Sequence, residues 1–181
     1  RVIKRLERYA LGLATQRHSR KDLQKLGSDY GGWVIPTSLL SNSSVCYCVG
    51  VGEDISFEMA LIDTFGCEVF AFDPTPKAVQ FVHENARNVR KYHFNDVGLW
   101  SENRRMRFYE PRNPNHVSHS IVNLQGTSRF FEAQCRRLSS LMADLNHDKL
   151  DLLKLDIEGA EYEVLESILE DQVEVKILCV E

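Results

Sequence analysis

The stretch VCYCVGVGED, residues 45–54, decides the fold class of this chain. Its first five residues are small, aromatic or β-branched, which is typical of a strand inside a parallel sheet. Gly50 and Gly52 let the backbone turn sharply and lie close to a ligand, and Asp54 is placed to cap a helix that continues to Phe65. A strand, a glycine turn and a helix start in this order indicate a nucleotide site in an open α/β sheet.

A second strand is expected at Glu68–Phe72, directly before Asp73. Asp73 follows Gly50 at close to the spacing of about 20 residues that separates a glycine turn from a ribose-binding acid. We therefore expect its carboxylate to accept hydrogen bonds from ribose hydroxyls. On that interpretation the substitution Asp73→Ala weakens cofactor binding and leaves folding nearly unaffected.

Further strands and helices are expected downstream. Pro76 begins a helix that ends near Asn85, and Tyr92–Asn95 is a third strand followed by Asp96. Asn95 and Asp96 then stand where a purine would be read. Residues 106–109 and 119–122 are predicted to form a hairpin, and residues 173–180 a fifth strand.

The stretch LDLLKLDIEGAE, residues 150–161, is predicted to be a fourth strand that brings three acids together. Asp156 and Glu158 share a face if the chain stays extended, and Glu161 lies one helical turn beyond Glu158. Carboxylates this close indicate a bound cation, a nearby base or a raised pKa. Glu161 also fits the preference of acids for a helix start.

Length and composition limit the class of protein. A chain of 181 residues most plausibly holds one domain with a core. The net charge of −4 gives no reason to expect a nucleic acid partner, and no apolar run reaches the roughly 20 residues of a membrane span. The five cysteines fit no metal-binding pattern, and Cys46 and Cys48 are interpreted as small buried side chains. The chain starts at Arg1 rather than Met, so an upstream signal or membrane anchor would not be visible here, and the compartment stays unknown.

We expect two parts, a helical lead-in over residues 1–30 and a catalytic domain over residues 31–181. The lead-in holds an amphipathic helix over residues 2–13 and a shorter helix from Ser19 or Arg20 to Leu26, before Gly27. Residues 30–36 are expected to form a rigid loop. Within it, Trp33 is either a hydrophobic plug or part of a lid over the cofactor pocket.

Four stretches of this chain resemble FkbM-type methyltransferases. They are CVGVGEDISF at 48–57, AFDP at 71–74, VGLW at 97–100 and, as the most specific, DLLKLDIEGAE at 151–161. The first two are shared with S-adenosylmethionine-dependent methyltransferases in general, and their residue sequence is most similar to the eukaryotic methyltransferase-like branch. One position departs from the pattern, because the acid often found two residues before the first glycine is Cys48 here.

The resemblance implies a Rossmann-like methyltransferase fold, a mostly parallel sheet with helices on both faces, and S-adenosylmethionine as cofactor. It also implies seven strands, so we expect the sheet of this sequence to be truncated after the fifth. Cofactor contacts would come from the backbone of Gly50 and Gly52, from Glu53 or Asp54 at the methionine amino group, from Asp73 at the ribose, and from Asn95 or Asp96 at the adenine.

The same resemblance implies O-methylation of a hydroxyl on a sugar or small-molecule acceptor. An alcohol must lose a proton during transfer, and a positioned base contributes about 10²–10⁴-fold. Asp156 is the first candidate for this base, and His119 or His116 the second. No metal is assigned to the acidic motif formed by Asp156, Glu158 and Glu161.

Two alternatives from other classes remain open. A nicotinamide-dependent oxidoreductase would share the first turn and Asp73, but its third fingerprint glycine would fall at Ile55. A non-catalytic binding or scaffold protein with the same fold is the other alternative, and Cys48 gives it mild support.

Overall fold

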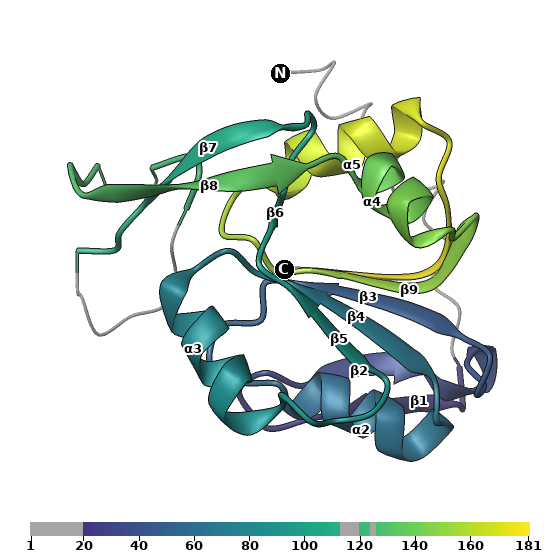
Figure 1. The fold of residues 1–181 in the computed structure, drawn as a ribbon. Coiled ribbons are helices and arrows are strands. Elements are labelled where there is room, and N and C mark those ends of the chain that lie inside the picture. Colours follow the sequence, from purple (N-terminus) through teal and green to yellow (C-terminus); the bar gives the residue numbers. More distant parts are fainter. Residues whose placement is uncertain (1–19, 113–119, 124–125) are drawn as a thin grey trace, which may run out of the picture.

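The computed structural model describes residues 20–112, 120–123 and 126–181, and its centre is a five-stranded parallel sheet (Figure 1). All neighbouring strands in this sheet pair in parallel. The arrangement confirms the predicted α/β fold and its five expected strands. Their order across the sheet is β10 (Glu174–Val180), β9 (Lys149–Leu155), β3 (Val45–Val49), β4 (Glu68–Phe72) and β5 (Tyr92–Asn95).

Helices cover both faces of this sheet, with α2 (Ser56–Phe65) and α3 (Pro76–Asn85) on one side and α4 (Leu138–Leu145) and α5 (Glu161–Glu170) on the other (Figure 1). The alternation of side chains along a strand explains the two layers. In β3, Cys46 and Cys48 lie in the core beneath α2, whereas Tyr47 lies in the core beneath α4 and α5. The five cysteines are free and buried, as predicted for Cys46 and Cys48.

A second sheet of three strands lies beside the first, with the order β6 (Gly98–Leu99), β8 (Phe130–Arg136) and β7 (Arg104–Tyr109). It corrects the predicted hairpin, because β7 pairs along its whole length with β8. Of the expected partner segment, the structure describes residues 120–122, and among these Ser120 forms a bridge to Tyr109. Pairing with β8 is more stable because β8 forms hydrogen bonds along all of β7 and adds aromatic packing, with the ring centroids of Phe108 and Phe131 5.2 Å apart.

The hairpin β1 (Leu23–Leu26) and β2 (Trp33–Pro36) corrects two further expectations, the short helix up to Leu26 and the loop over 30–36. Leu26 and Ile35 are buried in the core shared with α2, which favours strand pairing over an isolated helical turn. Residues 30 and 31, where the two parts of the chain were expected to meet, both lie in the turn of this hairpin. A short 3₁₀ helix, η1 (Thr37–Leu39), leads on to β3. The predicted helix over 2–13 lies outside the described residues.

Within the described part of the chain, no helix combines the length and the apolar character needed to cross a membrane.

Candidate functional site

The glycine turn after β3 is shaped by two residues in the left-handed region, Gly50 with φ 82° and Gly52 with φ 57°. A Cβ atom at Gly50 would overlap the backbone carbonyl oxygen of Asp156, so this position requires glycine. Helix α2 begins shortly afterwards, and the Asp54 carboxylate accepts the backbone N–H of Ser56 at 2.8 Å. The predicted strand, turn and helix start are confirmed.

Asp73 follows β4 and has a carboxylate that builds the turn. One oxygen, Oδ2, accepts the backbone N–H groups of Val51 and Gly52, both at 2.9 Å. The other, Oδ1, accepts the N–H of Thr75 at 2.8 Å and its hydroxyl at 2.6 Å. Asp73 is only 5% exposed, and its four bonds use the acceptor capacity of a carboxylate. These contacts argue against the expectation that Asp73→Ala spares folding, and the ribose contact stays a prediction.

One pocket opens where β3, β4 and β9 end, the edge at which open α/β sheets bind ligands. Seven of the predicted site residues line it: Gly50, Gly52, Glu53, Asp54, Asp73, Asp156 and Glu158. Asn95 and Asp96 lie at the end of β5 and do not line this pocket, and neither does Glu161.

The loop of the β1–β2 hairpin adds Tyr30 and Gly31 to the pocket wall. This loop is tied to the start of α2, because the Ser28 hydroxyl donates to Asp54 Oδ2 at 2.6 Å and the Ser28 N–H donates to the Ser56 hydroxyl at 2.7 Å. Trp33 does not line the pocket. Of the two interpretations left open for Trp33, its packing against the core agrees with the hydrophobic plug, and the aromatic residue at the pocket is Tyr30.

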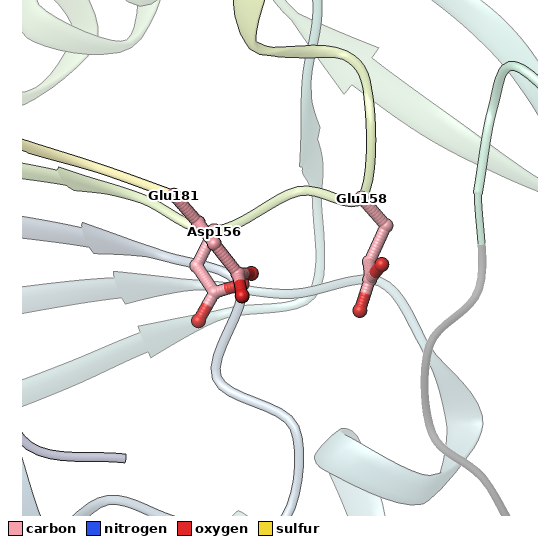
Figure 2. A group of neighbouring side chains, drawn as sticks. All are labelled: Asp156, Glu158 and Glu181. Atoms are coloured by element: carbon pink, nitrogen blue, oxygen red, sulfur yellow. The ribbon is translucent and has the colours of Figure 1, made fainter. Parts of the chain in front are cut away.

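Figure 2 shows three neighbouring carboxylates, those of Asp156, Glu158 and Glu181, each with an oxygen within 4.8 Å of the others. Glu158 has φ 55° and stands in a turn rather than in extended chain. A hydrogen bond with Asp156, together with its negative charge, raises the pKa of Glu181 to about 7. Exposed carboxylates commonly lie this close without an ion, so we assign no metal here.

Sequence reasoning missed Glu181, although a signal was present. Asp156 follows β9 and Glu181 follows β10, and these strands are parallel neighbours. Because parallel strands end at the same edge of a sheet, acids directly after two adjacent strands are brought together.

Glu161 has a structural place instead of a place in the pocket. Its carboxylate accepts the backbone N–H of Ile157 and of Gly159, both at 2.9 Å. Glu161 thereby closes the turn between β9 and α5, which agrees with the interpretation of this residue as a helix-start acid.

Lys154 is the second residue that sequence reasoning missed. Its Nζ donates to the Gly50 carbonyl at 2.6 Å and lies 3.7 Å from Asp156 Oδ2 and 3.8 Å from Glu58 Oε1. Burial opposes its charge, but the attraction of Glu58 and of other neighbouring groups outweighs burial and raises the pKa of Lys154. A cation therefore stands directly beneath the glycine turn.

The histidines proposed as alternative bases, His116 and His119, lie outside the described residues. The chain just after them does reach the site. The Ser120 hydroxyl donates to the Glu158 carbonyl at 2.6 Å, and Ile121 lines the pocket.

Comparison with known proteins identifies the family. Residues 45–181 match the model of the methyltransferase FkbM domain. Human "Probable methyltransferase-like protein 24" is 31% identical over 130 residues, which cover 71% of this chain and 29% of the relative. The rat protein of the same name is 30% identical over the same shares. The chain thus spans less than a third of the length of these relatives, and no solved structure matches it. Since the family model covers most of the chain, this protein belongs to the FkbM methyltransferase domain family.

Proposed function

We propose that this chain transfers a methyl group from S-adenosylmethionine to a hydroxyl on a sugar or another small-molecule acceptor. The observation that carries the proposal is a single pocket that joins the glycine turn after β3 to Asp156 after β9. Membership of the FkbM family supports the reaction class and the cofactor. The hydroxyl acceptor rests on the presence of a carboxylate that can take its proton.

The residues of the glycine turn fit such a cofactor. Gly50 and Gly52 have no side chains to occupy the space beside the strand end, so a ligand can approach the backbone there. Glu53 lines the pocket, is exposed and makes no hydrogen bond to another described residue. Asp54 is already occupied by Ser28 and Ser56. This difference favours Glu53 over Asp54 as the partner of the methionine amino group.

When bound, S-adenosylmethionine supplies an electrophilic methyl group on a sulfonium. The protein has to align the acceptor oxygen with that methyl, and alignment alone can lower the barrier by roughly 7–11 kcal/mol. Asp156 would accept the proton that the acceptor hydroxyl loses during methyl transfer. The Lys154 ammonium lies 3.7 Å from this carboxylate.

The charges around the pocket restrict the acceptor. Glu53, Asp156, Glu158 and Glu181 line it with acidic side chains, whereas the cation of Lys154, which also lines it, is engaged by Gly50. An anionic acceptor would be repelled. Neutral polyols, such as unsubstituted sugars, are compatible with this wall.

The proposal is tested by incubating the whole protein with methyl-labelled S-adenosylmethionine and a panel of neutral glycans and small alcohols. Asp156→Asn should lower turnover by about 10²–10⁴-fold and change cofactor affinity much less. Glu163→Gln, which removes the same charge from an exposed site on α5, should behave like the wild type.

Three outcomes would contradict the proposal. Normal turnover of the Asp156→Asn variant would remove this carboxylate as the base. Cofactor binding without transfer to any member of the panel would favour a binding or scaffold protein. Binding of a nicotinamide cofactor in place of S-adenosylmethionine would favour the oxidoreductase alternative.

A further inference from the structure

A buried ion pair lies beneath the glycine turn. Glu58 in α2 is fully buried, and the Lys154 side chain is 4% exposed. Their charged atoms, Oε1 and Nζ, are 3.8 Å apart. Neither carboxylate oxygen of Glu58 has a hydrogen-bond partner among the described residues. The pair therefore interacts through charge and not through an aligned hydrogen bond.

Such a pair is an expensive element of a core. Removing two charges from water costs several kcal/mol per ion, and well-packed apolar side chains are often more stabilising in their place. Burial raises the pKa of Glu58, and the attraction of Lys154 opposes that effect. Besides Glu58, the carboxylate of Asp156 lies within ion-pair distance of the Lys154 ammonium in the described chain, and it is not buried. Stability alone does not explain why these two residues are here.

The sheet register shows what the pair faces. In β9, Lys154 lies beside Cys48 of β3 and beside Cys179 of β10. These three residues point to the α2 side of the sheet, because Cys48 and Cys179 belong to the core on that side. Glu58 thus approaches Lys154 from α2, on the face of the sheet that this helix covers.

From this position Lys154 joins the two walls of the pocket. Its ammonium donates to the Gly50 carbonyl in one wall and lies 3.7 Å from Asp156 in the other. A lysine side chain has four flexible carbons, and its ammonium here has Asp156 within ion-pair distance as an alternative partner. An opposing charge on the core side limits that freedom.

We propose that Glu58 is a positioning residue, which holds the Lys154 ammonium at the Gly50 carbonyl and so fixes the glycine turn in its cofactor-binding shape. The inference rests on the proposed function, since it assigns the shape of this turn to binding of S-adenosylmethionine. Glu58 does not touch the pocket, because it is absent from the pocket wall. It acts through Lys154.

The test moves the carboxylate from the helix to the strand. Because Cys48 lies directly beside Lys154, Cys48→Asp places a negative charge next to the ammonium from another element. Three variants of the whole protein are compared with the wild type: Glu58→Gln alone, Glu58→Gln with Cys48→Asp, and Glu58→Gln with Cys48→Asn. The Asn variant has the shape of the Asp variant without its charge, and is the matched control.

We expect Glu58→Gln to weaken S-adenosylmethionine binding in a calorimetric titration by about tenfold or more, the loss expected for one hydrogen bond to a charged group. Cys48→Asp should restore most of this affinity and Cys48→Asn should not. A role in packing alone predicts no such difference. Wild-type affinity in Glu58→Gln, or equal rescue by Asp and Asn, would overturn the inference.

A second measurement does not depend on the cofactor. Amide hydrogen exchange at Val51 and Gly52 in the ligand-free protein should be faster in Glu58→Gln and should slow again with Cys48→Asp. If the wild type does not bind S-adenosylmethionine, the proposed function fails, and unchanged exchange in the variant would then separately overturn the positioning role.

A fourth variant covers the case in which Glu58→Gln does not fold. Glu58→Met combined with Lys154→Met removes both charges and should fold, because no unpaired charge remains in the core. It should still bind the cofactor about tenfold more weakly. Wild-type affinity in that variant would overturn the inference.

Discussion

Asp73→Asn tests whether this acid builds the glycine turn. The Asn oxygen can still serve Val51 and Gly52, but the new NH₂ group then faces the N–H of Thr75. The Thr75 hydroxyl can rotate to accept, whereas the Thr75 N–H cannot. One buried donor is left unpaired, at a cost of about 1–3 kcal/mol, and the remaining bonds lose their charge-assisted strength, about 1 kcal/mol more. We expect a loss of roughly 2–4 kcal/mol in the free energy of unfolding.

The assay is urea and thermal unfolding of the cofactor-free protein. For a chain of this size, that loss corresponds to a fall in Tm of roughly 4–16 °C. Glu53→Gln is the matched control, because it removes the same charge from an exposed side chain of the same turn. It should unfold like the wild type and bind the cofactor more weakly. If Asp73→Asn unfolds within about 0.5 kcal/mol of the wild type, the range of ordinary surface substitutions, the structural role of Asp73 is refuted.

Three further expectations concern the same edge of the sheet. Gly50→Ala should prevent correct folding, measured as loss of the cooperative unfolding transition, because the new Cβ would overlap the Asp156 carbonyl; a native-like transition would contradict this. Glu161→Gln should cost about 1–3 kcal/mol in urea unfolding, since the amide leaves the N–H of Ile157 or Gly159 without an acceptor, and the exposed control Glu163→Gln should cost nothing measurable. The raised pKa of Glu181 implies a contribution to folding stability that is fully present below about pH 4.5 and is lost as the pH rises to about 7. In unfolding measurements across this pH range, Glu181→Gln should remove the corresponding change in the free energy of unfolding. An unchanged pH dependence in this variant would assign the effect to another group.

The central sheet could be predicted from sequence because each of its strands carries its own local signal. The segments 45–49 and 68–72 are short apolar runs that end at a glycine turn or at an acid. The start of helix α3 is indicated by Pro76 in its first turn. For these elements the local preference and the tertiary environment agree.

The β1–β2 hairpin could not be predicted in this way. Three of the four residues of β1 are exposed, and the segment has no alternating pattern to distinguish it from a helical turn. What makes it a strand is its partner β2 and the burial of Leu26 and Ile35 against the rest of the core. Those contacts depend on where the chain has been brought by the sheet.

The site divides along the same line. Glycines and single acids at strand ends can be recognised in the sequence, and the predicted residues Gly50, Asp73 and Asp156 do line one pocket. Glu58 was invisible, because a glutamate in the first turn of a helix looks like a solvated helix-start acid. Its burial follows only from the lysine on the facing strand, which is itself unexpected in a core.

Two charged side chains of opposite sign therefore hold the glycine turn, one from each side. On the β4 side, Asp73 accepts the N–H groups of Val51 and Gly52. On the β9 side, Lys154 donates to the carbonyl of Gly50. The carboxylate of Asp73 thus accepts from the backbone N–H groups of the turn, and the ammonium of Lys154 donates to its first backbone carbonyl. These hydrogen bonds fix the orientations of the peptide groups before a ligand binds. A turn fixed in this way loses little conformational entropy on binding, so changes at either support should lower cofactor affinity even when the pocket wall itself is untouched.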